Sequence, residues 1–113
     1  MSASAMKSSA PSVRHIDIGK DFSPILGPRY VHLGPHSGQL FLEKWLEPAF
    51  LEADVVVIGL DAIELPSASF FEEAFGGLVR KYGLASVEKK LRFNAVLRKY
   101  LVPKIQEWMR RAA

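Results

Sequence analysis

Hydrophobic side chains recur along the chain with two different spacings, which predict alternating strands and helices. Residues 14–19 alternate, with isoleucines on one side and polar residues on the other, as expected of a half-buried strand. Residues 54–60 are apolar without alternation, which is typical of a central strand that is covered on both faces. Residues 29–33 and 87–93 alternate again and predict a second strand and a charged edge strand.

Three other segments repeat apolar residues every three or four positions, which is the spacing of one helix face. The first of these segments follows Ser37, a predicted N-cap. The second opens with a predicted capping box, in which Ser69 and Glu72 satisfy each other's free backbone donors. The third spans residues 94–111 and contains Pro103, which we expect to kink or split the helix.

The predicted order of elements is β-β-α-β-α-β-α, in a small α/β domain with a four-stranded mixed sheet and helices packed on it. The turn-rich connection over residues 21–28 predicts antiparallel pairing of the first two strands. Helices between the later strands imply right-handed crossovers and a parallel arrangement there. Residues 1–12 lack periodicity, so we expect a disordered leader followed by one α/β domain over residues 13–113.

The composition of the chain limits the classes of protein to which it can belong, but it does not indicate an activity. The chain has 113 residues, of which 49% are hydrophobic, as expected of a single globular domain. It has no cysteine, which excludes disulfides, thiolate metal sites and a cysteine nucleophile. The longest apolar run, residues 55–60, is far shorter than the ~20 residues that span a bilayer. The predicted leader has no apolar centre and so is not a signal peptide; we expect a cytoplasmic protein without a membrane partner.

The net charge of +3 conceals an uneven distribution. Residues 1–78 carry five Lys and Arg against ten Asp and Glu, whereas residues 79–113 carry ten against two. Such a split is compatible with a solvated helix face, but it also suggests a nucleic-acid-binding surface as an alternative function. The residues of that alternative surface are Lys89, Lys90, Arg92, Arg98 and Lys99.

The loop after the predicted central strand is the expected position of a functional site. In open α/β sheets, ligands bind beyond the carboxyl ends of the strands. The helix that follows this loop begins near Ser67 and Ser69, and a helix N-terminus can accept an anion or a phosphoserine. The alternative is structural, with one serine as the helix cap and the other as a turn residue.

Enzymatic chemistry has little support in the sequence. Glu72 and Glu73 are adjacent on a helix and point about 100° apart, so they do not form a catalytic pair. His32 and His36 are separated by Gly-Pro, which rules out the helix that would bring them together on a metal. No Ser/His/Asp arrangement has a recognisable local context. We therefore expect a protein that is not an enzyme and that has no metal or cofactor.

Several short motifs give the chain a resemblance to the bacterial STAS-like domain family, whose name refers to sulphate transporters and anti-sigma-factor antagonists. The resemblance covers about residues 14–111. The motifs are Phe22-Ser23, Gly27-Pro28-Arg29-Tyr30, Gly34, Ser37-Gly38, Phe41, Pro66-Ser67-Ala68-Ser69-Phe70 and Glu73-Ala74-Phe75-Gly76-Gly77-Leu78-Val79.

The resemblance implies a regulatory module that binds another protein and needs no cofactor. In anti-sigma-factor antagonists, a partner kinase phosphorylates a serine at the start of the helix after the central strand. This similarity makes Ser69 and Ser67 the candidate phospho-acceptors. It also suggests a partner such as a histidine-kinase-type ATPase or an anti-sigma factor. The expected partner-binding residues are Asp61, Glu64, Pro66, Phe70 and Glu73.

Overall fold

The structure, a computed structural model, describes residues 10–113 of the chain. Strands and helices alternate over this range, and residues 18–22, 42–46 and 72–76 are π-helical. In chain order, the elements are β1 (Val13–Asp17), η1 (Ile18–Phe22), η2 (Val31–Leu33), α2 (Gly38–Phe41), η3 (Leu42–Leu46), α3 (Glu47–Glu52), β2 (Val55–Gly59), α4 (Ala68–Phe71), η4 (Glu72–Gly76), α5 (Gly77–Tyr82), α6 (Leu84–Lys90), β3 (Leu91–Asn94) and α7 (Leu101–Ala112).

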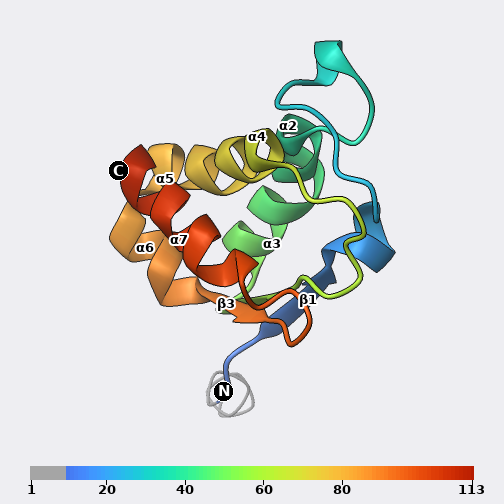
Figure 1. The fold of residues 1–113 in the computed structure, drawn as a ribbon. Helices are drawn as coiled ribbons and strands as arrows, with labels where there is room; N and C mark the ends of the chain where they lie inside the picture. Colours follow the sequence, from blue (N-terminus) through green and yellow to red (C-terminus); the bar gives the residue numbers. More distant parts are fainter. Residues whose placement is uncertain (1–9) are drawn as a thin grey trace.

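The sheet has three parallel strands in the order β1-β2-β3, so the predicted four-stranded mixed sheet is wrong. Parallel neighbours need long connections, and both connections pass through helices that lie on one face of the sheet (Figure 1). The central strand was predicted correctly as β2, in which Val56 and Ile58 are fully buried under these helices. Val55 and Val57 point to the other face and are half-buried, so β2 is not covered equally on both sides.

The segment predicted as the second strand, residues 29–33, contains instead the short 3-10 turn η2. It lies in a loop that projects from the body of the molecule (Figure 1). The backbone N–H of Leu33 donates to the carbonyl of Tyr30 at 3.0 Å, which closes the turn. Val31 and Leu33 are 48% and 59% exposed, because a Gly-Pro pair on each side holds the segment away from the sheet. Alternation therefore predicted a strand at residues 29–33, although no strand among residues 10–113 lies close enough to pair with it.

The predicted edge strand over residues 87–93 is half helix and half strand. The first part belongs to α6, and β3 begins only at Leu91. Leu84, Val87 and Leu91 are three and four positions apart and all pack in or against the core, which is helical spacing. A strand through the whole segment would have placed Lys89 on the same inward face as Val87, and burial of an unpaired ammonium is costly.

The predicted final helix is wrong over residues 94–100, which form the end of β3 and a loop. Helix α7 begins at Leu101, so Pro103 is its third residue. A backbone N–H at that position would have no partner within the helix, so proline fits there and need not kink it. As a consequence, Leu97 lies outside the helix and is 78% exposed.

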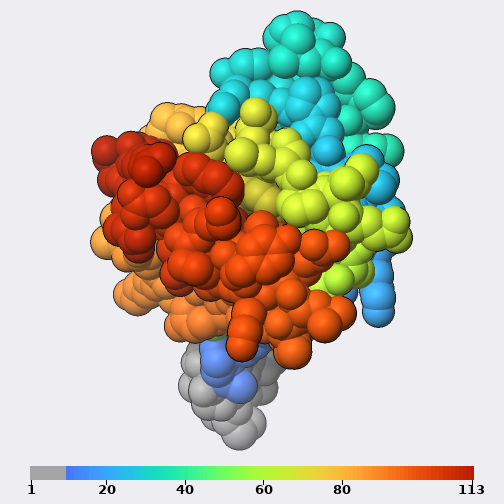
Figure 2. All heavy atoms as spheres, viewed as in Figure 1, coloured from blue at the N-terminus to red at the C-terminus, as the bar shows by residue number. Residues whose placement is uncertain are grey.

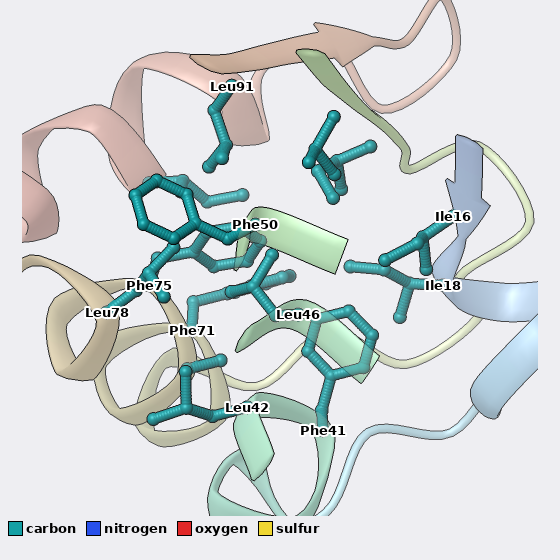
Figure 3. Close-up of a cluster of buried hydrophobic side chains, with 14 of the residues drawn as sticks. Ile16, Ile18, Phe41, Leu42, Leu46, Phe50, Phe71, Phe75, Leu78 and Leu91 are labelled. Carbon is teal, nitrogen blue, oxygen red and sulfur yellow. The ribbon is translucent and has the colours of Figure 1, made fainter. Parts of the chain in front are cut away.

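The core lies between the sheet and the two long helical segments, residues 38–52 and 68–82. Large aromatic side chains from both segments are buried there, and Figure 3 shows Phe41, Phe71 and Phe75 among them, with Ile16 and Leu91 of the sheet. The helical segments approach closely because small residues stand at their crossings. A Cβ on Gly38 would lie 2.4 Å from the carbonyl oxygen of Phe70, and one on Gly77 would lie 2.7 Å from Cδ2 of Leu42.

The predicted leader lies mostly outside the described residues, which begin at residue 10. Its last residue, Ser12, is bound to the body of the domain. The Ser12 N–H donates to the carboxylate of Asp54 at 2.9 Å, and the Asp54 N–H donates to the Ser12 carbonyl at 3.1 Å. Among residues 10–113, no helix combines the length and the apolar character needed to cross a membrane.

Candidate functional site

The carboxyl ends of the three strands lie side by side and carry the loops that form the candidate site. Asp17, Gly59 and Asn94 are the last residues of β1, β2 and β3, and they are in register with one another. The loop after β2 covers residues 60–67, and the loop after β3 covers residues 95–100. This is the edge of the sheet at which open α/β folds place their functional groups.

Asp61 holds the loop after β3 in place. Its carboxylate accepts the backbone N–H of Arg98 at 2.9 Å and that of Val96 at 2.9 and 3.0 Å from its two oxygens. These donors stabilise the ionised form, so the N–H groups of Arg98 and Val96 lower the pKa of Asp61 below its ordinary value. The sequence suggested Asp61 as a partner-binding residue. In the structure, its carboxylate instead holds the backbone of the loop after β3.

Further hydrogen bonds join the loop after β2 to the segment that follows η1. The backbone N–H groups of Glu64 and Leu65 both donate to the carbonyl of Pro24, at 2.7 and 3.0 Å, and the N–H of Leu26 donates to the Leu65 carbonyl at 3.0 Å. On the other side, a guanidinium N–H of Arg98 donates to the Glu64 carbonyl at 3.2 Å. Three segments that are distant in sequence are thereby fixed against one another.

These three segments expose an unusual set of large apolar side chains, which we call the apolar edge. Leu97 is 78% exposed, Val96 71% and Leu65 58%. Figure 2 shows the loop after β3, in orange, beside the loop after β2, in yellow-green, on one face of the molecule. Large apolar side chains that are exposed together on neighbouring loops are a feature of interaction sites. The apolar edge consists of Ile25, Leu65, Val96, Leu97 and Tyr100.

Most of the apolar edge was not predicted, because residues 94–111 were expected to form one helix that contains Leu97. The available signal was Pro103, which is favoured in the first turn of a helix. A helix that begins two residues before Pro103 leaves Leu97 in a loop, where its side chain has no core to enter.

The two candidate serines lie at the start of α4, but their roles differ from the prediction. Ser67, and not Ser69, is the N-cap, because its hydroxyl accepts the backbone N–H of Phe70 at 3.3 Å. The predicted capping box of Ser69 and Glu72 is therefore wrong. Ser69 is half-buried at the second helical position, and no hydrogen bond to its hydroxyl occurs among residues 10–113.

Of the other expected partner-binding residues, only Glu64 and Pro66 are exposed. Phe70 is fully buried, and its ring packs against Phe22 and Phe41 with centroid distances of 5.9 and 5.5 Å. It therefore belongs to the core, and a docked partner would not reach its ring.

Glu73 is engaged in an ion-pair network below the projecting loop. Its side chain is only 15% exposed and lies 3.4 Å from Arg80 and 3.9 Å from Arg29. Arg29 in turn donates to Glu72 at 2.5 Å. This hydrogen bond and the attraction of the carboxylates raise the pKa of Arg29 above its ordinary value. The network fastens the projecting loop to η4.

The basic residues of the alternative nucleic-acid surface do not form one surface. Lys89 and Lys90 end α6, before the first residue of β3, whereas Arg98 and Lys99 follow its last residue. Three of the five are held internally: Lys90 by the Phe50 carbonyl, Arg98 by the Glu64 carbonyl, and Arg92 by carbonyls at the end of α6. Lys89 and Lys99 are exposed.

Metal ligands do not gather at this site or elsewhere among residues 10–113, where no cluster of three or more His, Asp or Glu side chains could hold an ion. The polar groups of the edge serve instead to fix backbone. The edge therefore exposes aliphatic and aromatic surface beside a few charges.

Comparison with known proteins gives one match. The family model of the STAS-like domain of unknown function (DUF4325) matches residues 37–96. This range runs from the N-cap of α2 to the loop held by Asp61 and includes β2, β3 and the serines of α4. No curated protein and no solved structure matches the chain. Because the match covers more than half of its length, the chain belongs to the STAS-like domain family.

Proposed function

We propose that this domain is a non-enzymatic regulatory module that docks a protein partner through the apolar edge. One observation carries the proposal: the two most exposed large apolar side chains among the described residues, Leu97 and Val96, lie in a loop whose backbone Asp61 fixes. Fixing the backbone of this loop does not bury its exposed apolar side chains. It does reduce the entropy lost when a partner covers the loop, which improves affinity.

The chemistry of the edge also favours binding over catalysis. Its central side chains are aliphatic, and the carboxylate and guanidinium beside them, from Asp61 and Arg98, are occupied by backbone groups. General acid–base or nucleophilic catalysis would need such groups to be directed at a substrate. A partner with an apolar groove would instead cover Leu65 and Leu97 together.

The family resemblance supports the choice of partner class and of regulation. A STAS-like domain suggests a partner such as an ATPase-type kinase or an anti-sigma factor, and a switch by serine phosphorylation. Ser69 is the acceptor that we favour, because the hydroxyl of Ser67 is already committed to the helix cap. Ser69→Asp, as a mimic, is expected to weaken partner affinity at least tenfold, whereas Ser69→Ala retains it, as measured by calorimetry.

The experiment that tests docking compares charged substitutions at equally exposed leucines. Leu65 lies on the apolar edge and Leu51 lies on α3, before the first residue of β2, and each is 58% exposed. Leu65→Asp and Leu97→Asp are expected to abolish recovery of the partner from lysate of the source cell, whereas Leu51→Asp retains it. The partner, once purified, is then titrated with each variant.

Two results would contradict the proposal. In the first, both edge variants recover the same proteins as the parent chain. In the second, the recovered material is nucleic acid, and its affinity falls steeply with salt, as release of counterions from phosphates requires. The second result would favour the basic residues of the C-terminal part over the apolar edge.

A further inference from the structure

A hollow of about 550 Å³ lies at the opposite end of the strands from the apolar edge. It opens between the end of α3, the end of α5 and helix α6, and its volume is in the range of small-molecule sites, roughly 300–1,000 Å³. Neither the family match nor the proposed docking function assigns a role to it. Its lining residues are Phe50, Asp54, Tyr82, Ser86, Lys89 and Lys90.

One wall of the hollow is aromatic. The rings of Phe50 and Tyr82 pack against each other with a centroid distance of 4.9 Å. The hydroxyl of Tyr82 donates to the carboxylate of Glu47 at 2.5 Å. This hydrogen bond fixes the ring and leaves the hydroxyl proton unavailable to a ligand. What Tyr82 offers to the hollow is therefore its aromatic surface, on which a planar ring can stack.

The hollow also carries two positive charges without carboxylate partners. The ammonium of Lys90 donates to the Phe50 carbonyl at 2.6 Å and lies 4.8 Å from the centre of the Phe50 ring. Lys89 is exposed on the adjacent position of α6. Among the ion pairs of residues 10–113, none involves either lysine.

The acidic group of the lining, Asp54, forms no ion pair with these lysines among residues 10–113. The carboxylate of Asp54 accepts the N–H and the hydroxyl of Ser12 at 2.9 and 3.3 Å, so it is directed at the start of β1. Ser86, one turn before Lys89 and Lys90, adds an exposed hydroxyl that can donate to an anion.

We infer that this hollow binds a small molecule that joins a planar ring to a phosphate group. The ring would lie against Tyr82, because Phe50 is only 5% exposed and the Lys90 ammonium lies over its ring. The phosphate would accept from Lys89 and Ser86 and from an N–H of Lys90 that the Phe50 carbonyl does not occupy. Two lysines match a phosphate monoester in charge, since such a group carries about −1.5 to −2 at pH 7. The assignment is independent of the docking function, because the two sites lie at opposite ends of the sheet.

The test is a titration of the isotope-labelled chain, followed by two-dimensional NMR, with AMP and with phenyl phosphate as probes. Saturable shifts centred on the amides of Ser86, Lys89 and Lys90 are expected with at least one probe. Adenosine has the planar ring without the phosphate, and inorganic phosphate lacks the ring. Each is therefore expected to bind at least tenfold more weakly than the better of the two probes. No saturable binding by either probe, or shifts centred elsewhere, would overturn the assignment.

Three variants separate a specific site from general attraction between charges. Lys89→Gln removes one ammonium and is expected to weaken binding at least tenfold. Lys99→Gln removes another exposed positive charge, beyond the other end of β3, and is expected to leave affinity unchanged. Ser86→Leu fills the hollow without changing charge and is expected to weaken binding. Equal losses for the two lysine variants would show non-specific attraction and would refute the site.

Discussion

Replacing Gly38 by alanine tests the helix contact that positions the start of α2 against the start of α4. Glycine in a helix costs roughly 0.5–1 kcal/mol relative to alanine, so propensity alone predicts that Gly38→Ala stabilises the domain. The structure predicts the reverse. The new Cβ would lie 2.4 Å from the carbonyl oxygen of Phe70 and 3.0 Å from its Cα, and backbone cannot rotate away as a side chain can.

Overpacking of this kind costs about 1–3 kcal/mol. After the gain in propensity, Gly38→Ala is expected to destabilise the domain by about 1–2 kcal/mol and to lower Tm by roughly 4–8 °C. Thermal unfolding followed by circular dichroism, together with urea titration, measures both quantities.

Gly76→Ala is the matched control, because Gly76 is also helical and also lies at a contact between helices. Its Cβ would meet Nη1 of Arg80 at 3.2 Å and Cβ of Ala112 at 3.3 Å, and the long arginine side chain can move. Stability is expected to stay unchanged or to rise by up to about 1 kcal/mol. The reasoning fails if Gly38→Ala is as stable as the parent chain, or if Gly76→Ala is the more damaging of the two.

Two further predictions concern the caps and the loop of the candidate site. Ser67→Ala is expected to cost about 1 kcal/mol in urea unfolding, because it removes the N-cap, while Ser69→Ala costs less than half of that; the reverse order would contradict the assigned cap. The N–H groups of Arg98 and Val96 depress the pKa of Asp61, so the contribution of this carboxylate to stability is complete above its unfolded pKa and is lost as the pH falls through the lower, folded pKa. The amide shifts of Arg98 and Val96 are expected to titrate together at acidic pH and to stop doing so in Asp61→Asn; persistence of that titration in the variant would show that another group causes it.

The parts of the fold that the sequence predicted are those in which local pattern and burial agree. The apolar run that became β2 pairs with β1 and β3, and the side chains on one of its faces are buried under helices. Ser37 was predicted as an N-cap, and its hydroxyl does accept the N–H of Leu40 at 3.0 Å. A cap depends only on residues within one turn, which is why spacing can identify it.

The wrong predictions of secondary structure have two causes. Some residues fit both the helical and the strand periodicity, and a strand forms only where another strand lies close enough to pair with it. Residues 29–33 alternate, but alternation does not specify a pairing partner, and none lies beside this loop. Leu84, Val87 and Leu91 fit a helix, whereas Leu91 and Phe93 fit a strand, and the boundary falls between the two patterns at Leu91. Local spacing cannot place such a boundary when one apolar residue serves both elements.

The sequence analysis expected the candidate site at the carboxyl edge of the sheet and favoured its charged residues, whereas the structure shows large exposed apolar side chains there. Charged residues were expected to bind the partner. In the structure, however, the carboxylates of Asp61 and Glu73 are engaged in hydrogen bonds or ion pairs within the domain. The exposed leucines and valine could not be recognised, because exposure is a property of the folded chain. Only the three-dimensional arrangement joins Leu65 to Leu97.

Site-specific photocrosslinking in the source cell tests the docking function most directly. A benzoylphenylalanine in place of Leu97 reports whatever covers the apolar edge. The same residue in place of Leu51, a leucine that is 58% exposed against 78% for Leu97, reports a surface at the other end of the strands. The account predicts a covalent adduct with one protein from position 97 that is absent from position 51 and that disappears when Leu65→Asp is added. Adducts that are identical at both positions, or an adduct at position 51 alone, would contradict it.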